Sequence, residues 1–180
     1  MARTQKSPPK EARRPVWAEV DLGALAENFQ AIRKFVNPPE EKRKTPRKIL
    51  CIVKGNGYGH GGPQVAKALE KAGSDWFGVT CTEEGIAVRE AGVRKPILVL
   101  TSFWPGEESR LVEHDLTAVI HRCEQLKQLD RAAARSGRPL GRSGSSASRK
   151  VSFHLKMDTG MNRLGWLHRT PANKLPNRSA

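Results

Sequence analysis

The residues best suited to chemistry in this chain lie in the stretch 48–62, KILCIVKGNGYGHGG. It begins with the apolar run 49–53, rich in β-branched residues, which predicts a short strand buried on both faces. Lys54 follows this run directly. A lysine at the end of a buried strand is costly unless it has a covalent or ionic role, and barrel enzymes place their catalytic groups at that end. Position alone fits equally a lysine that extends from the strand end into water.

A second stretch, 154–165 (HLKMDTGMNRLG), is also predicted to be a strand that ends in a polar, glycine-containing turn. Together with VKGNGYGHG and with WAEVDL at 17–22, it closely resembles the N-terminal barrel of alanine racemase, over roughly residues 15–164. The resemblance implies a pyridoxal 5'-phosphate-dependent isomerase of the TIM-barrel class. Such an enzyme interconverts L-alanine and D-alanine, and D-alanine biosynthesis supplies precursors of cell-wall peptidoglycan.

The elements that position these two stretches alternate regularly between strand and helix. Runs typical of strands are found at 49–53, 76–80, 97–100, 117–120 and 151–155. Helical patterns lie between them, at 63–72, 83–91, 107–113 and 124–134, and three of these are followed by Gly73, Gly92 and Gly137, where helix C-terminal glycines belong. This alternation predicts a parallel α/β sheet. Periodicity fits a barrel and a doubly wound sheet equally well.

Towards the N-terminus, residues 1–14 are basic, contain prolines and show no periodicity, so we expect a disordered tail. A short strand is expected at 16–20. Asp21 is then the expected N-cap of a helix. The apolar residues of that helix are Leu22, Leu25, Phe29, Ile32 and Val36. Residues 37–48 hold three prolines and a charge cluster, which predicts a loop.

Length limits how much of the barrel this chain holds. A complete (β/α)8 barrel needs about 250 residues, and this chain has 180. We therefore expect an α/β fold with about five of the eight β/α units, spanning residues 15–165, and without the family's C-terminal β domain. Residues 139–148 are rich in glycine and serine and predict a flexible loop, and 166–180 are expected to be an irregular tail.

The resemblance assigns roles to four side chains. Lys54 matches the catalytic lysine that binds the cofactor covalently and acts as the base on one face of the substrate Cα. Tyr58 matches a tyrosine beside the cofactor phosphate. Arg163 matches an arginine that holds the cofactor's phenolic oxygen and lies close to the substrate carboxylate. Lys156 matches a lysine that is carbamylated in many members and steadies the arginine, which an unmodified lysine would repel.

The remaining residues of the motifs are expected to be structural. Gly55 and Gly57 stand where the family often has alanines, which loosens the loop without removing a functional group. His60 is expected to be a hydrogen-bonded loop histidine. No ligand spacing or chemical role is expected of His114, His121, His154 and His168.

Racemisation needs a base on each face of Cα, and in this family the second base is a tyrosine from the C-terminal domain of the partner subunit in a homodimer. Tyr58 is the single tyrosine of this chain. The resemblance therefore implies a truncated racemase that is inactive by itself.

Two alternative functions share part of this pattern. Residues 57–62 fit G-x-G-x-x-G, the dinucleotide-binding fingerprint, and Glu83 lies about twenty residues further on. In that fold, however, the first glycine follows the strand closely, whereas three residues, Lys54 to Asn56, intervene here. The other alternative is a single-barrel protein that binds pyridoxal phosphate without racemising an amino acid. The turn MDTGMNRLG and the start WAEVDL favour the racemase.

Charge and cysteine content bear on partners and location. The net charge is +14, but the cations cluster in 1–14, 41–48 and 131–150, which contain no aromatic residues for stacking on bases. No nucleic-acid partner is therefore expected. The three cysteines are far apart and lack metal-ligand spacing, which favours reduced thiols in the cytoplasm and no metal site. No apolar run approaches the ~20 residues of a membrane span.

Overall fold

The computed structural model describes residues 18–41, 44–137 and 151–167. The expected basic tail, the expected loop at 139–148 and most of the expected C-terminal tail lie outside these residues. Residues 18–20, the described part of the strand expected at 16–20, form neither strand nor helix.

Five parallel strands form the main sheet, in the order β1-β2-β3-β4-β5. They are β1 (Leu50–Ile52), β2 (Trp76–Val79), β3 (Ile97–Val99), β4 (Leu116–Ile120) and β5 (Phe153–Leu155). A doubly wound sheet reverses its strand order at a switch point, whereas a barrel adds each strand beside the last. The observed order is that of a barrel, and it confirms the expected partial (β/α)8 fold.

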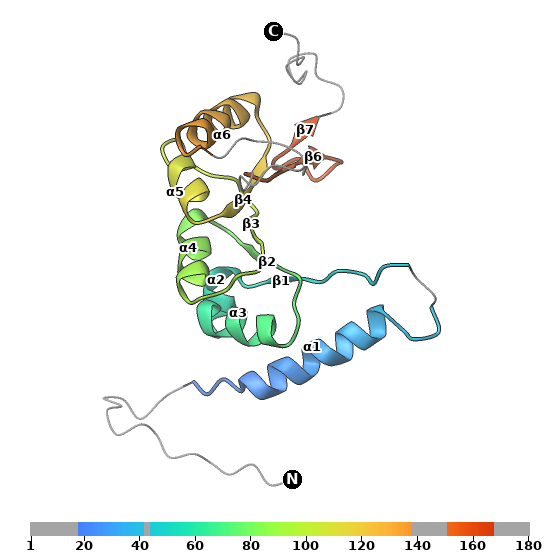
Figure 1. The fold of residues 1–180 in the computed structure, drawn as a ribbon. Coiled ribbons are helices and arrows are strands. Elements are labelled where there is room, and N and C mark those ends of the chain that lie inside the picture. Colours follow the sequence, from blue (N-terminus) through green and yellow to red (C-terminus); the bar gives the residue numbers. More distant parts are fainter. Residues whose placement is uncertain (1–17, 42–43, 138–150, 168–180) are drawn as a thin grey trace, which may run out of the picture.

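Helices cover one face of this sheet (Figure 1). They are α3 (Gly62–Lys71), α4 (Thr82–Glu90), α5 (Glu108–Glu113) and α6 (Cys123–Arg135). Each element lies within one or two residues of its sequence-based prediction. Gly73, Gly92 and Gly137 take φ values of 103°, 94° and 69°, the left-handed conformation that ends a helix most easily at glycine.

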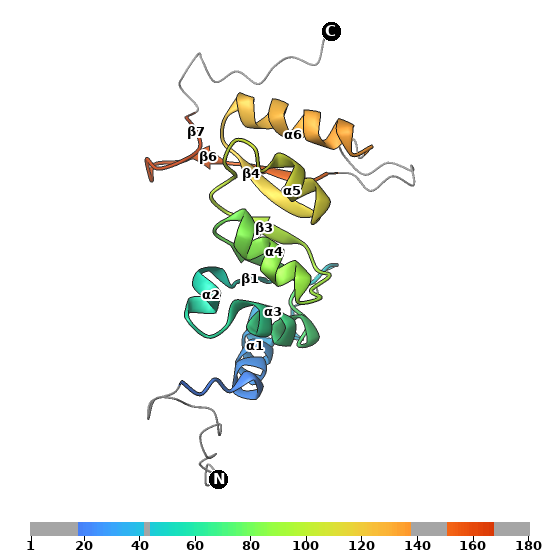
Figure 2. The same ribbon diagram turned by 90° about the vertical axis from the view of Figure 1, so that its left-hand side faces the viewer.

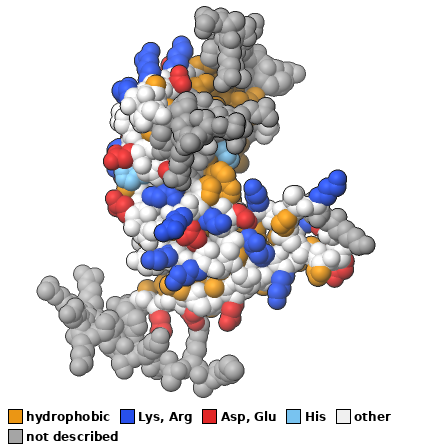
Figure 3. All heavy atoms as spheres, viewed as in Figure 1, with side chains coloured by type: hydrophobic (Ala, Val, Ile, Leu, Met, Phe, Trp, Pro, Cys, Tyr) orange, Lys and Arg blue, Asp and Glu red, His pale blue; other side chains and the backbone are white. Residues whose placement is uncertain are grey.

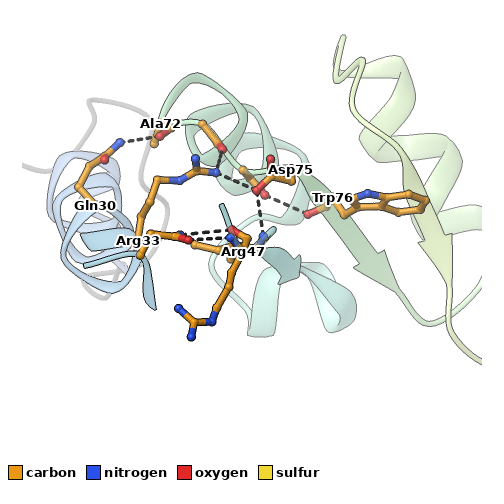
Figure 4. A network of polar contacts seen from close by, with 10 residues as sticks. Gln30, Arg33, Arg47, Ala72, Asp75 and Trp76 are labelled. Carbon is orange, nitrogen blue, oxygen red and sulfur yellow. Dashed lines mark hydrogen bonds and ion pairs between the residues drawn. The ribbon is translucent and has the colours of Figure 1, made fainter. Parts of the chain in front are cut away.

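Helix α1 (Leu22–Val36) begins as predicted, at Asp21. The Asp21 carboxylate accepts hydrogen bonds from the N–H groups of Gly23 and Ala24, both at 2.9 Å. A network of polar contacts then ties α1 to the amino-terminal ends of β1 and β2 (Figure 4). Arg33 donates to the Asp75 carboxylate at 2.8 Å, and the same carboxylate oxygen accepts from the Ile49 N–H at 2.9 Å.

The core lies between the sheet and the helices. Alternate strand residues point into it and are fully buried: Phe77, Val79, Ile97, Val99, Ala118 and Ile120. Their neighbours on the same strands point to the opposite face of the sheet.

That opposite face is concave. Trp76 of β2 and His154 of β5 lie on it with their ring centroids 5.5 Å apart. In a flat sheet these strands would be roughly 14 Å apart, because adjacent strands are spaced about 4.8 Å. The sheet therefore curves as a barrel wall does, and Figure 1 shows β1 to β4 following one another beside the layer of helices. Some hydrophobic side chains remain exposed on the concave side (Figure 3), in keeping with an open barrel.

A second, two-stranded parallel sheet follows β5. It pairs β6 (Met157–Asp158) with β7 (Trp166–Leu167). Trp166 is only 3% exposed and joins the core cluster. Residues 166–180 were expected to be irregular from their first residue, and this expectation was wrong for Trp166 and Leu167. Residues 168–180 lie outside the described part of the chain.

Candidate functional site

Both sequence motifs lie at the carboxyl ends of the parallel strands. Lys54 comes two residues after β1, and Lys156 comes directly after β5. Because the strands run parallel, these ends share one edge of the sheet. Figure 2 shows α2, which begins at Lys54, on the same side of the molecule as β6 and β7. β1 and β5 are the two outer strands of the sheet, so the motifs occupy opposite ends of the arc.

The segment after Lys54 forms an unusual left-handed turn, α2 (Lys54–Tyr58), where a glycine-containing loop was expected. Gly55, Asn56, Gly57 and Tyr58 all have left-handed backbone angles, with φ between 52° and 65°. Residues with a Cβ resist this conformation by about 1–2 kcal/mol each, and glycine and asparagine adopt it most easily. The composition of the turn is thus explained by its handedness. Tyr58 is the residue of the turn least suited to it.

Hydrogen bonds hold this turn closed. The Gly57 N–H donates to the Val53 carbonyl at 2.8 Å, and the Gly62 N–H donates to the Asn56 side-chain oxygen at 2.8 Å. A Cβ on Gly57 would lie 3.1 Å from the Cα of Gly62, so these two backbone segments approach closely. The His60 ring nitrogen Nδ1 lies 3.0 Å from the carbonyl oxygens of Gly57 and Tyr58, which confirms His60 as a hydrogen-bonded loop residue.

The side chains of this first motif differ in exposure. Lys54 is half-buried at the end of the strand, and Tyr58 is 62% exposed. Sequence reasoning did not identify Glu84, on the first turn of α4, as a residue that contacts this motif. Its carboxylate accepts hydrogen bonds from the N–H groups of Gly55 and Thr80, both at 2.7 Å. Acidic residues are common in the first turn of a helix, so the sequence had no signal that this one reaches the Lys54 turn.

The second motif is organised by Asp158. Its side-chain oxygen Oδ1 accepts from the N–H groups of Gly160 at 3.0 Å and Asn162 at 3.1 Å. These backbone N–H groups favour the charged carboxylate and lower the pKa of Asp158. Gly165 closes the turn with a φ of 140°, and a Cβ there would lie 2.4 Å from the Asp158 backbone nitrogen. Arg163, within this turn, is exposed.

Lys156 lies beside the end of β4. Its N–H donates to the Ile120 carbonyl at 2.9 Å, which continues the β4–β5 register and places Lys156 opposite His121. Burial, together with the charges of Arg122 and Lys156, lowers the pKa of His121. The His121 Nδ1 atom is buried without a hydrogen-bond partner among the described residues.

The structure places the four predicted site residues at or just beyond the carboxyl ends of the outer strands β1 and β5. Within residues 18–41, 44–137 and 151–167, no hydrogen bond or ion pair joins the side chains of Lys54, Tyr58, Lys156 and Arg163. The same described residues contain no group of histidine, cysteine or acidic side chains able to hold a metal ion. None of their helices is long and apolar enough to cross a membrane.

Comparison with known proteins gives a consistent result. Residues 20–177 match the family described as alanine racemase, N-terminal domain. The alanine racemase of Symbiobacterium thermophilum is 41% identical over 152 residues, which are 84% of this chain and 35% of that protein. Alanine racemase 1 of Caldanaerobacter subterraneus is 35% identical over 154 residues, 86% of this chain and 35% of that protein. This chain thus spans about a third of the length of these relatives.

Solved structures show the same relationship. An alanine racemase from Clostridium difficile 630 superposes with a TM-score of 0.71 at 28% identity, covering 86% of this chain and 36% of that one. The alanine racemase from Streptomyces coelicolor A3(2) gives a TM-score of 0.66 at 28% identity, covering 83% of this chain and 35% of that one.

Proposed function

This chain belongs to the alanine racemase N-terminal domain family. We propose that it carries the part of a pyridoxal 5'-phosphate-dependent alanine racemase active site that contains the catalytic lysine. One observation supports this most strongly. Lys54 stands half-buried at the carboxyl end of a barrel strand, followed by a left-handed turn that hydrogen bonds hold closed. The proposed role of the intact enzyme is to supply D-alanine for peptidoglycan precursors in the cytoplasm, as a homodimer.

The chemistry of the side chains at this edge fits the cofactor. Lys54 offers a primary amine that reacts with an aldehyde, and Tyr58 offers a hydroxyl group suited to the phosphate. Arg163 offers a planar guanidinium suited to a phenolate or a carboxylate. Pyridoxal phosphate, when bound, supplies a carbonyl carbon for the amine and a ring that absorbs the negative charge left on Cα.

We assign the proton transfer on one face of Cα to the Lys54 amine. A neutral amine accepts a proton, and an amine fixed at a strand end meets Cα from one side only. Arg163 orients the substrate through its carboxylate. Lys156 steadies Arg163 if its amine is carbamylated, because the added carboxylate reverses the sign of the charge beside the guanidinium.

The opposite face of Cα needs a second base. The chain's single tyrosine, Tyr58, lies in the turn after Lys54 and is assigned to the phosphate. We therefore propose that this chain alone binds the cofactor weakly and does not racemise alanine. A pyridoxal phosphate-binding role without racemisation is the second candidate, and the missing second base favours it for the isolated chain. Dinucleotide binding is not favoured by the described part of the chain, because residues 57–62 do not follow β1 directly and the strand order does not reverse there.

Borohydride trapping tests the cofactor assignment. A lysine amine condenses with the aldehyde and releases water, and hydride then reduces the resulting C=N bond to a stable amine. After treatment of the purified chain with pyridoxal phosphate and borohydride, peptide mapping should find the label concentrated on Lys54. Lys54→Ala should lose it, whereas Lys67→Ala, which removes an exposed lysine of α3, should not. A label spread evenly over many lysines would contradict the assignment.

A further inference from the structure

The Glu84 carboxylate accepts hydrogen bonds from the backbone just beyond the ends of β1 and β2, where the hydrogen bonds between these two strands stop. Oε1 accepts from the Gly55 N–H and Oε2 from the Thr80 N–H, each at 2.7 Å. Both distances are at the short end for N–H···O bonds, as is common for carboxylate acceptors. One side chain from α4 thus binds a backbone group on each of two neighbouring strand ends.

The backbone geometry explains why a side chain is needed there. The last ladder bond between the strands runs from the Val53 N–H to the Gly78 carbonyl, at 2.8 Å. Beyond it the chain enters the left-handed turn, and Gly55 has a φ of 60°. This turn carries the Gly55 N–H away from the sheet ladder. Glu84 supplies the acceptor that β2 no longer offers.

Lys54 therefore lies between two anchored backbone groups. The Val53 N–H is fixed to β2, and the Gly55 N–H is fixed to Glu84. Fixing both neighbours limits the backbone angles of Lys54 and hence the direction in which its side chain leaves the strand.

We propose that Glu84 is a positioning residue that fixes the turn after Lys54 and so directs the Lys54 amine. The chemical role of the Lys54 amine rests on the proposed function, whereas the fixing of the turn by Glu84 does not. Glu84 touches no reacting atom in this account. It acts through the Gly55 backbone.

Helix capping explains only part of this geometry. In a capping box, the carboxylate at the third helical position accepts from the backbone N–H of the N-cap residue. Glu84 is the third residue of α4, but it accepts from Thr80, one residue before the N-cap Cys81. The bond to Gly55, 29 residues earlier in the chain, has no capping role. It is this second bond that links α4 to the Lys54 turn.

The test compares Glu84→Gln with Glu83→Gln in the full chain. Both changes remove one negative charge from the first turn of α4. Glu83 is exposed and pairs with Arg110 at 2.7 Å, away from the Lys54 turn, so it is a matched control. In Glu84→Gln, an NH2 donor replaces one of the two carboxylate oxygens. Because the two N–H groups bind different oxygens, one of them loses its acceptor if the side chain keeps its position.

Two measurements are made on each variant. The first is amide hydrogen exchange at Gly55 and Thr80 without cofactor, with the amides of Leu98 and Val99 in β3 as the folding reference. The second is the share of borohydride-trapped pyridoxal phosphate found on Lys54. In Glu84→Gln, we expect exchange at one or both of the first two amides to rise about tenfold, for the loss of one charge-assisted hydrogen bond. The label on Lys54 should fall to that of a surface lysine, and Glu83→Gln should change neither.

The other outcomes overturn the proposal. Unchanged exchange at both Gly55 and Thr80 shows that Glu84 does not hold the turn. Faster exchange with an unchanged label on Lys54 shows that the turn does not direct the amine. If the unmodified chain shows no preference for Lys54, the proposed function fails, while the exchange measurement still decides whether Glu84 holds the turn.

A second variant is used if Glu84→Gln fails to fold. If Glu84→Gln exposes the β3 reference amides, Glu84→Asp replaces it. The aspartate keeps the charge but is one methylene shorter, so it should reach only one of the two strand ends. Faster exchange at either Gly55 or Thr80, with β3 protected, supports the proposal, and unchanged exchange at both overturns it.

Discussion

The two motifs of this chain lie at the same edge of the sheet but differ in how many neighbouring elements fix their backbone. The turn after Lys54 is held from β1, β2 and α4 and closes on its own backbone. The turn that carries Arg163 follows the outer strand β5 and is held by Asp158 and by the two-residue strand β7. The first motif is thus preorganised by the described chain. Among the described residues, the second is held by the Asp158 hydrogen bonds within its own turn and by the pairing of β6 with β7.

This difference suggests how the site is assembled. The amine of Lys54 gains its position from neighbours within the first two β/α units. Arg163 is exposed at the open end of the arc, where a barrel would continue with further strands. In the proposed function, cofactor attachment and substrate orientation therefore depend on different parts of the fold, and changes in one motif should leave the other intact.

Gly165→Ala should have the largest effect and should be confined to the second motif. The new Cβ would lie 2.4 Å from the Asp158 backbone nitrogen, so β6 and β7 cannot keep their pairing. We expect hydrogen exchange to accelerate at Gly160 and Asn162 while Gly57 stays protected. Gly160→Ala is the control, because it also has a positive φ but no atom within 4 Å of the added Cβ. Loss of protection at Gly57 in the Gly165 variant would show that the two motifs are coupled.

Lowering the pH should also affect the second motif before the first. The folded pKa of Asp158 lies below its unfolded value, so its contribution to the second turn is complete above an ordinary aspartate pKa of about 4. That contribution is lost as the pH falls through the lower, folded pKa. NMR titration should show the amide signals of Gly160 and Asn162 moving together below pH 4, before any change at Gly57. Asp158→Asn should remove this step, and its persistence would contradict the assignment.

Gly55→Ala should have the smallest effect. The φ of 60° makes alanine cost about 1–2 kcal/mol, but no atom lies within 4 Å of an added Cβ. We therefore expect a modest fall in thermal stability and an unchanged preference of pyridoxal phosphate for Lys54. Gly57→Ala, whose Cβ would meet the Gly62 backbone at 3.1 Å, should cost more. Equal losses in the two variants would show that close packing at Gly57 is unimportant.

Much of the fold could be predicted from sequence, because apolar periodicity and glycine punctuation reflect burial directly. The five strands, the Asp21 cap and the three helix-ending glycines were all found in this way. The barrel order was not decided by periodicity, since it depends on which strands pair. β7 was missed because two residues have no detectable period, and Trp166 is buried by tertiary contacts.

The candidate site was predictable only in part. The motifs identified which residues to consider, but the resemblance, not the spacing, supplied their roles. The left-handed turn was not foreseen as a whole, although Gly55, Asn56 and Gly57 are residue types that tolerate it. Glu84 could not be singled out, because its hydrogen bond to Gly55, 29 residues earlier, depends on how α4 packs against the end of β1.

The most direct test of this account is the formation of D-alanine from L-alanine by the purified chain with pyridoxal phosphate. Loss of general acid or base catalysis costs about 10²- to 10⁴-fold, and we propose that the single tyrosine of this chain, Tyr58, does not serve as the second base. We predict no racemisation beyond that of the free cofactor, although Lys54 is labelled by borohydride trapping. A rate well above free cofactor that disappears in Lys54→Ala would show that Lys54 alone serves both faces, and would contradict the account.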